Sequence, residues 1–425
     1  MRIEFSPSLA KGKIKPPPSK SQIHRCVIGG GLAEGETIID NVGSVEISDD
    51  LKATIACMEN LGVRIKRIGD RLVIEGIGSE FLKKMSKKRD IIQMPCGESA
   101  TTFRLLVPVC LALGLDADFI CGSGLMKRPM DEFESLAEDH GFDFKESPGS
   151  YKLRGKIRPG TYRISGQISS QYISGFLMAL PLLEGESTLE PLGRVKSWPY
   201  IDMTLDTMKQ FGINITESDN VFHIKSSKYL PSRIEAEGDY SSASYIEALN
   251  LFGGDVQVEG LNRTSVQADK DYPKFFRMLK KERPVIDLSA CPDLGPLLFA
   301  IAGAFNGGVF KGTERLAFKE TDRLEKMKVN LDKLGVGMDI GDDQVQIHAR
   351  GNKVGRIRPE GDLKSFGDHR LAMALSVLLT RTGGCLDGAE AVSKSYPNFF
   401  KDLEKLGIEL KYLEGWTNET HRENA

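Results

Sequence analysis

The chain has 425 residues, a length typical of two or three domains, and its 57 Lys and Arg nearly balance its 59 Asp and Glu. The resulting net charge of -2 argues against a general nucleic-acid binder, which would carry a basic excess. A hydrophobic content of 40% with 27% charged residues is typical of a soluble globular protein and excludes a disordered chain.

Targeting and metal signals are missing from the sequence. The longest apolar stretches, residues 176–183 and 297–305, fall short of the ~18 residues that a membrane-spanning helix needs. Residues 1–5 include an early acid and start no apolar run, so we expect no signal peptide and a cytoplasmic location. The seven cysteines form no CxxC pair and the six histidines show no ligand spacing. We therefore expect no disulfide framework and no required metal.

Six copies of one pattern follow each other along the chain. In each copy a β-rich run follows a glycine turn, and an amphipathic helix then ends at a glycine before the next strand. The copies begin near residues 34, 113, 184, 252, 306 and 384. Because loose similarities are common in α/β proteins, it is the shared order of six copies that indicates a true internal repeat.

A polar cluster that opens an apolar helix precedes each copy. Helices that are apolar nearly all round are expected to be buried, so each repeat reads as strand, buried helix, strand, exposed helix, strand, strand. The clusters supply residue types that cap helix N-termini, and they lie at 19–22, 98–102, 169–171, 241–244, 292–295 and 367–370.

Basic residues stand beside these helix starts. Helix N-termini carry unpaired N–H groups and partial positive charge, so they favour anions. Taken singly, each cation is most simply a surface residue, but their repetition at helix starts favours a substrate with several negative charges, such as two phosphates and two carboxylates. There is no Walker-type loop and no dinucleotide fingerprint, so no nucleotide cofactor is expected.

Nine short motifs then occur in a fixed order: Pro18–Arg25, Ser99–Arg104, Ser169–Gln171, Ser197–Asp202, Gly238–Ser244, Pro292–Asp293, Lys319–Arg323, Gly367–Arg370 and Lys394–Pro397. Together they resemble the 3-phosphoshikimate 1-carboxyvinyltransferases, or 5-enolpyruvylshikimate-3-phosphate synthases, over essentially the whole chain.

The resemblance implies an α/β enolpyruvyl-transferase fold of two domains, each with three βαβαββ units and buried parallel helices. The first strand belongs with the C-terminal domain, so residues 21–239 form one domain and residues 1–20 with 240–425 the other. The implied reaction transfers the enolpyruvyl group of phosphoenolpyruvate to the 5-hydroxyl of shikimate 3-phosphate as the domains close. It releases phosphate and serves chorismate and aromatic amino-acid biosynthesis without a cofactor. We expect a monomer with these small-molecule partners, and neither nucleic acid nor a membrane.

The resemblance also assigns roles to residues. Asp293 is the base for the 5-hydroxyl, Glu320 the acid that handles the C3 methylene proton, and Lys20 lies near both substrates. Binding of shikimate 3-phosphate falls to Lys20, Ser21, Arg25, Ser169, Ser170, Gln171, Ser197, Asp293 and Lys319. Binding of phosphoenolpyruvate falls to Lys20, Ala100, Arg128, Gln171, Arg323, Arg370 and Lys394.

Two positions depart from the family pattern. Ala100 stands where many members have glycine, and its methyl group predicts weak inhibition by glyphosate, a competitor of phosphoenolpyruvate in this family. The loop 122–129 is one residue short, and the arginine that helps to hold phosphoenolpyruvate is replaced by Leu125 or lost. Lys127 or Arg128 is then the substitute.

Three other functions remain open at this point. The sister enzyme that transfers enolpyruvyl to UDP-N-acetylglucosamine shares the architecture, but it has a cysteine inside the glycine loop, whereas Cys121 precedes this one. An RNA 3′-phosphate cyclase would call for nucleotide motifs and a basic tract. A non-catalytic anion-binding module would not need the carboxylates of Asp293 and Glu320.

Overall fold

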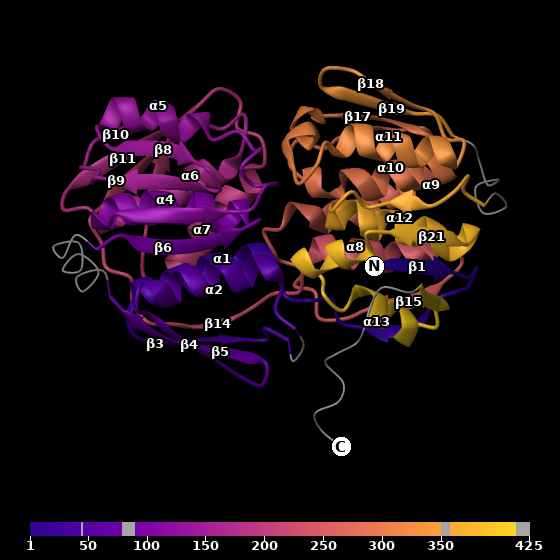
Figure 1. Cartoon of the computed structure of the whole chain (residues 1–425), viewed down its shortest axis with the longest axis horizontal. Helices are drawn as coiled ribbons and strands as arrows, with labels where there is room; N and C mark the ends of the chain where they lie inside the picture. Colours follow the sequence, from indigo (N-terminus) through magenta and orange to yellow (C-terminus); the bar gives the residue numbers. More distant parts are fainter. Residues whose placement is uncertain (44–45, 79–89, 350–357, 414–425) are drawn as a thin grey trace. The chain divides into compact units, whose positions relative to one another are not determined.

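The computed structural model describes residues 1–43, 46–78, 90–349 and 358–413 (Figure 1). The chain divides into two compact units. Unit 1 contains Met1–Pro16, Tyr240–Gly260 and the chain from Asp269 onward, and unit 2 contains Pro17–Asp239 with Leu261–Ala268. Unit 2 therefore begins four residues before residue 21, where that domain is expected to start, and it includes a short segment from beyond residue 239.

In its described residues, unit 2 contains three four-stranded sheets, each with one parallel pair extended by an antiparallel hairpin. Two sheets follow the chain in βαβαββ order, and the third takes its first strand from the end of the unit. The sheets are β14(Arg233–Glu235)-β3(Glu34–Asp40)-β5(Arg71–Ile77)-β4(Arg64–Ile68), β6(Ile92–Gly97)-β7(Ala117–Cys121)-β9(Ser150–Arg154)-β8(Asp143–Ser147) and β10(Thr161–Ser165)-β11(Glu186–Leu192)-β13(Val221–Lys225)-β12(Thr216–Ser218).

The described part of unit 1 contains two sheets of the same kind and one sheet of two strands. The first strand of the chain, β1, pairs antiparallel with both β21 and β22. The two-stranded sheet lacks the final hairpin, since the chain passes from α9 directly into the next sheet. The sheets are β16(Val285–Asp287)-β17(Gly308–Lys311)-β19(Gln344–Ile347)-β18(Met338–Ile340), β20(Leu363–Lys364)-β21(Gly384–Asp387)-β1(Arg2–Phe5)-β22(Leu410–Leu413) and β15(Asp255–Val258)-β2(Lys11–Ile14).

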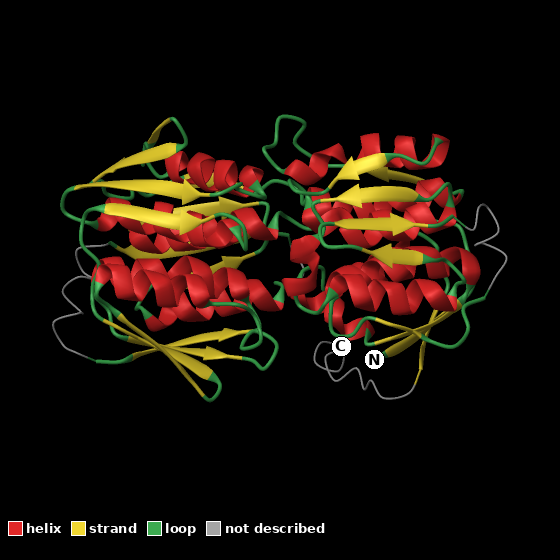
Figure 2. Cartoon of the chain, turned by 90° about the horizontal axis from the view of Figure 1, so that it is seen from above, coloured by secondary structure: helices red, strands yellow, loops and turns green. Residues whose placement is uncertain are grey.

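Within each unit the helices lie between layers of strands (Figure 2). Six apolar helices are buried along most of their length, and in α10 every residue is buried. They are α1(Lys20–Leu32), α4(Ala100–Leu113), α6(Ser170–Ala179), α8(Tyr240–Ala248), α10(Gly295–Ala304) and α12(His369–Thr382). Six other helices of the described chain are more polar and expose one face. They are α2(Asp49–Asn60), α5(Asp131–His140), α7(Trp198–Gln210), α9(Tyr272–Lys281), α11(Arg323–Lys333) and α13(Phe399–Lys405).

Close packing requires glycine in the helices that carry the site. A Cβ atom added to Gly175 on α6 would lie 2.3 Å from the carbonyl oxygen of Arg104 on α4. Two backbones this close fix the relative height of the two helices, because no side chain stands between them. The first turns of α4 and α6 are thereby held in register.

The predicted N-caps form at only some of the buried helices. The side chains of Ser99, Ser169 and Asp368 accept backbone N–H groups of α4, α6 and α12. Ser19 makes no capping hydrogen bond to α1, and Asp293 does not cap α10. The uncapped positions correct the prediction, and for Asp293 the reason is that its carboxylate binds cations.

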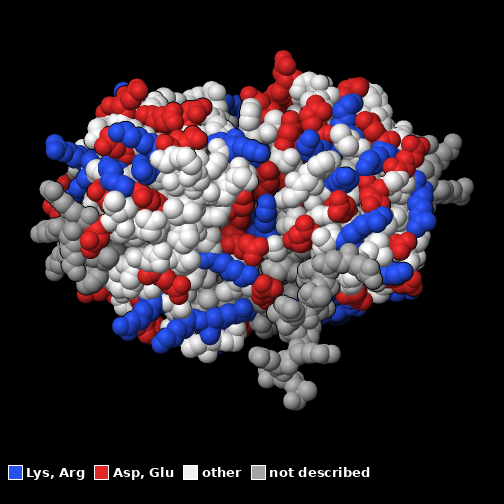
Figure 3. Space-filling view, viewed as in Figure 1, with Lys and Arg blue, Asp and Glu red and all other residues white. Residues whose placement is uncertain are grey.

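Charge is mixed on the surface. On the face drawn in Figure 3, acidic and basic side chains are interspersed over both units, as the small net charge leads one to expect. Among the described residues, no helix combines the length and apolarity that crossing a membrane requires.

Candidate active site

In unit 2, α1 begins with a lysine that is held by an acid. Lys20 Nζ lies 2.6 Å from Asp50 Oδ2 in the first turn of α2, and the two side chains are only 15% and 12% exposed. Limited exposure makes this a stronger constraint than a surface ion pair. The ammonium group predicted to lie near both substrates therefore has a fixed place at the start of the helix.

One turn further along α1, the guanidinium of Arg25 is buried among neutral oxygens. Its nitrogen atoms donate to Thr204 Oγ1 at 2.7 Å, the Ser21 carbonyl at 2.6 Å and the Tyr200 carbonyl at 3.1 Å. Burial lowers the pKa of Arg25 to about 10, and no carboxylate of the described residues forms an ion pair with it. A buried cation without a negative partner attracts an anion strongly.

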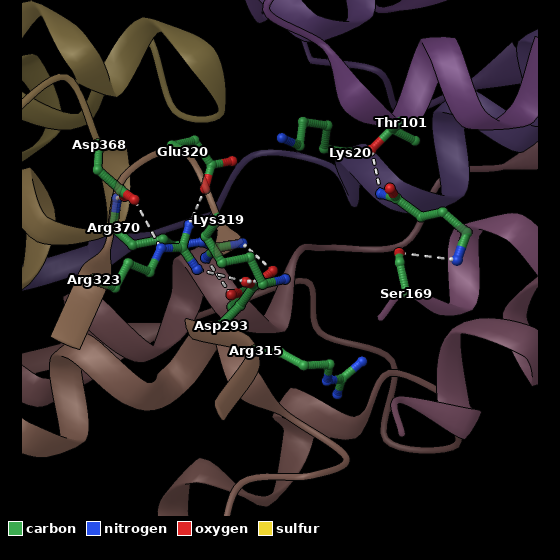
Figure 4. A network of polar contacts seen from close by, with 12 residues as sticks. Lys20, Thr101, Ser169, Asp293, Arg315, Lys319, Glu320, Arg323, Asp368 and Arg370 are labelled. Atoms are coloured by element: carbon green, nitrogen blue, oxygen red, sulfur yellow. Dashed lines mark hydrogen bonds and ion pairs between the residues drawn. The ribbon is translucent and has the colours of Figure 1, made fainter. Parts of the chain in front are cut away.

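The start of α6 is connected to the start of α4. Ser169 Oγ accepts the N–H of Gln171 at 3.2 Å, and Gln171 Nε2 donates to Thr101 Oγ1 at 2.8 Å (Figure 4). Gln171 Oε1 in turn accepts from Arg104 Nη1 at 3.3 Å. The amide of Gln171 is therefore fixed at both ends.

The remaining unit 2 candidates lie at helix starts or in the short loop. Ser170 and Ala100 are each 5% exposed in the first turns of α6 and α4. Ser197, at the start of α7, is also 5% exposed and has a left-handed φ of 61°, a strained value that is typical of functional positions. In the loop, Leu125 is fully buried, so its side chain faces the core, and Arg128 is half-buried.

In unit 1, Arg323 lies at the centre of three carboxylates. Its guanidinium donates to Glu320 Oε2 at 2.6 Å, Asp368 Oδ2 at 2.7 Å and Asp293 Oδ1 at 2.9 Å (Figure 4). The side chain is 1% exposed, and although burial opposes its charge, the three carboxylates raise the pKa of Arg323. This arginine organises the whole group.

Asp293 has the reverse arrangement, one carboxylate among three cations. Besides Arg323, it lies 3.2 Å from Arg370 Nη2 and 3.5 Å from Lys319 Nζ. Burial would favour the neutral acid, but the charges of Lys319, Arg370 and Arg323 outweigh it and hold the pKa of Asp293 well below its usual range. Burial lowers the pKa of Lys319, and Asp293 partly offsets this effect.

The start of α12 carries the last predicted cations. Asp368 Oδ1 accepts the N–H of Arg370 at 2.7 Å, which fixes the arginine backbone, and the Arg370 side chain also reaches Ser241 Oγ. Lys394 Nζ donates to the carbonyl of Gly367 at 2.9 Å. Lys394 is thus tied to the same turn without touching the other predicted residues.

Several residues of the network were not predicted from the sequence. Asp368 belongs to a predicted helix-capping cluster, but no sequence signal pairs it with Arg323. Asp50 gave no signal that would pair it with Lys20. Arg315, 5% exposed, donates to the Ser289 carbonyl at 3.0 Å and lies near enough to Lys319 to lower its pKa. Such contacts depend on packing between distant segments.

Taken by itself, the unit 1 group can both bind and exchange protons. Its cations outnumber its carboxylates once Lys394 is included, which suits a phosphate or a carboxylate ligand. Asp293 and Glu320 supply two carboxyl groups held by the same arginine. Among the described residues, no group of three or more His, Cys, Asp or Glu side chains is arranged to hold a metal ion.

Known proteins are similar to this chain in sequence and in fold. A family model described as EPSP synthase (3-phosphoshikimate 1-carboxyvinyltransferase) matches residues 6–403. Relatives named 3-phosphoshikimate 1-carboxyvinyltransferase include one from Clostridium novyi, 34% identical over 95% of this chain and 97% of its own length. Another, from Clostridium botulinum, is 35% identical over 95% and 97%.

Solved structures agree on the fold. The EPSP synthase of Acinetobacter baumannii superposes with a TM-score of 0.75 at 22% identity, covering 97% of this chain and 100% of that one. The enolpyruvyl transferase NikO of Streptomyces tendae gives 0.71 at 13% identity, covering 96% and 98%. The α/β enolpyruvyl-transferase fold that the family resemblance implied is therefore confirmed. The chain belongs to the EPSP synthase family of 3-phosphoshikimate 1-carboxyvinyltransferases.

Proposed function

We propose that this chain transfers the enolpyruvyl group of phosphoenolpyruvate to the 5-hydroxyl of shikimate 3-phosphate, the reaction of its family, and that the residues described above carry it. The observation that supports the residue roles best is the network of Asp293 with Lys319, Arg323 and Arg370. It combines a base with the cations that two anionic substrates require.

Shikimate 3-phosphate is proposed to bind chiefly to unit 2. Arg25 is a buried cation whose partners are neutral, and the hydroxyls of Ser21, Ser169, Ser170 and Ser197 lie at helix starts. A phosphate monoester carries roughly −1.5 to −2 charges near neutral pH, which suits hydroxyl and N–H donors at helix N-termini. The family resemblance also assigns Gln171 and Lys20, together with Asp293 and Lys319 of unit 1, to this substrate.

Phosphoenolpyruvate is proposed to bind to Arg323, Arg370 and Lys394 of unit 1. Arginines suit planar carboxylates and phosphates, because their N–H groups form paired hydrogen bonds. The family resemblance also assigns Lys20, Gln171 and Ala100 of unit 2 to this ligand, with Arg128 as the substitute for the missing loop arginine.

The proposed reaction proceeds by addition and elimination. Asp293 accepts the proton of the 5-hydroxyl while the hydroxyl oxygen bonds to C2 of phosphoenolpyruvate. In the same step Glu320 gives a proton to C3. In the second step Glu320 takes a proton back from C3, the C2–C3 double bond forms again, the C2–O bond to phosphate breaks, and phosphate leaves. Substrate anions that neutralise Lys319 and Arg370 raise the pKa of Asp293, so binding itself makes the carboxylate a better base.

Release of phosphate from purified protein tests the proposal. Phosphate should appear only when shikimate 3-phosphate and phosphoenolpyruvate are both present, and D293A and E320A should abolish turnover while retaining the fold. UDP-N-acetylglucosamine serves as the alternative acceptor. Turnover with that acceptor instead of shikimate 3-phosphate contradicts the proposed substrate, and unchanged turnover in D293A contradicts the proposed base.

We also propose that sensitivity to glyphosate depends on the methyl group of Ala100. Ala100 is buried in the first turn of α4, so its Cβ occupies space that glycine leaves empty. We expect weak inhibition of the wild-type protein by glyphosate and stronger inhibition of A100G, measured as the inhibition constant against phosphoenolpyruvate. Tight competitive inhibition of the wild type would contradict this role.

The proposal also covers the location, the oligomeric state and the domain boundaries of the protein. We propose a cytoplasmic monomer with domains formed by residues 21–239 and by residues 1–20 with 240–425. The division into two compact units supports two domains, and the pairing of β1 with β21 and β22 supports the assignment of the first strand. Sedimentation at micromolar concentration should give the mass of one chain, and a dimer mass refutes the monomer.

A further inference from the structure

The loop that departs from the family pattern is folded around a glutamate. Gly124 donates its N–H to Glu98 Oε1 at 3.1 Å, and Gly122 donates to the carbonyl of Gly97 at 2.7 Å. A Cβ atom on Gly122 would lie 2.2 Å from Glu98 Oε1, and one on Gly124 would lie 2.5 Å from Oε2. The carboxylate therefore occupies the space that side chains of this loop would otherwise fill.

Glu98 belongs to the turn that starts α4. It follows Gly97, whose φ of 54° reverses the chain after β6, and precedes Ser99, which caps α4. Its backbone is thus continuous with Ala100 and Thr101. One side chain consequently links the start of α4 to the loop.

The other end of the loop is also tied down. The carbonyl oxygen of Pro129 accepts from Arg104 Nη2 at 3.1 Å and from Tyr172 Oη at 2.8 Å. Arg104 also binds Gln171, and between the two ends the fully buried Leu125 anchors the loop in the core. The loop has little freedom while Glu98 is in place.

We propose that Glu98 is a positioning residue for phosphoenolpyruvate, holding the loop 122–129 so that Lys127 and Arg128 supply its positive charge; this rests on the proposed function. Lys127 is exposed and Arg128 is half-buried. Leu125, which follows Gly124, is fully buried in the core.

Four variants test the inference: E98A, E98Q, G124A and the double variant E98A/G124A. E98A loses a hydrogen bond to a charged group and should raise the KM for phosphoenolpyruvate about tenfold or more. The KM for shikimate 3-phosphate and kcat should stay within about twofold of the wild type. E98Q keeps an acceptor of the same shape for the Gly124 N–H and should remain close to wild type.

The double variant separates a specific contact from a general disturbance. G124A introduces a methyl group where Oε2 lies, and because Gly124 has no left-handed φ the backbone accepts alanine. It should therefore act by displacing Glu98, so G124A should match E98A and add nothing to it in the double variant. E138A, an exposed glutamate on α5, is the control and should have wild-type constants.

The outcomes distinguish a failure of the proposed function from a failure of the role of Glu98. If the wild type releases no phosphate from the substrate pair, the proposed function fails. If the wild type is active but E98A keeps its KM for phosphoenolpyruvate, the role of Glu98 is wrong, even when the variant unfolds at a lower temperature. Should E98A not fold, a wild-type KM in G124A overturns the inference equally.

Discussion

The replacement of Arg323 by methionine should be one of the most destabilising single changes in unit 1. The side chain is 1% exposed, and it bonds Glu320, Asp293 and Asp368, the last of which is fully buried. Methionine matches the unbranched stem of arginine but lacks the charged end of the guanidinium group. The change therefore leaves three neighbouring carboxylates without the cation that they share.

The magnitude follows from the burial of these partners. Removing one member of a buried ion pair costs about 3–5 kcal/mol, because the remaining charge is left uncompensated. For a unit of this size each kcal/mol shifts the melting temperature by about 2–4 °C, so the drop should be roughly 6–20 °C. Calorimetry and urea unfolding at pH 7 measure both quantities.

An exposed ion pair in the same unit provides the control. Arg358 Nη2 lies 3.4 Å from Glu4 Oε1, with side-chain exposures of 68% and 36%. R358M should cost no more than about 1 kcal/mol. If R323M lowers the free energy of unfolding as little as R358M does, burial does not govern the energy of this network. That result refutes the reasoning.

The other predictions concern protons and packing. The pKa of Asp293 is depressed in the folded chain, so its ion pairs stabilise above the unfolded value near pH 4 and lose their effect below it; the stability difference between wild type and D293N should shrink as pH falls from 7 to 3. G175A should cost about 1–3 kcal/mol in urea unfolding, because its Cβ meets the Arg104 carbonyl, whereas G160A, with open space around it, should be neutral. S169A removes a helix cap and should cost about 1 kcal/mol of unfolding free energy, and an unchanged midpoint would show that the cap is not needed.

The sequence allowed the repeats to be predicted because their signals are local. A glycine in left-handed conformation ends α4 at Gly114 and α5 at Gly141, and no other residue adopts that φ as easily. The buried helices are just as visible, since a helix such as α10 has no charged residue at all. These features need no knowledge of the rest of the chain.

The pairing of strands from distant segments could not be predicted from the local sequence pattern. β14 has only three residues and completes a sheet with β3 across nearly two hundred positions of sequence, and β2 pairs with β15 at a similar separation. Short strands carry little periodicity, so their partners are decided by the tertiary packing. The assignment of β1 to the C-terminal half came only from the family resemblance.

The site divides in the same way. Lys20 and Arg323 lie in recognisable motifs, but their partners depend on how helices pack. Asp50 meets Lys20 because α1 and α2 run side by side, and Glu98 enters the loop 122–129 because the glycines leave room for it. A cation can be found by its motif, whereas the acid that positions it is fixed by the fold.

This pairing of acids with cations links binding to proton transfer. Asp293 accepts hydrogen bonds from the same arginines that are proposed to hold phosphoenolpyruvate, so a substrate anion must share Arg323 and Arg370 with it. Every interaction that the substrate takes from Asp293 weakens the forces that depress its pKa. A substitution of Arg323 or Arg370 should therefore change both the binding of the anion and the pKa of Asp293, so kcat and KM should change together. Such coupling makes the network one functional element, in which no single residue is only a binder or only a base.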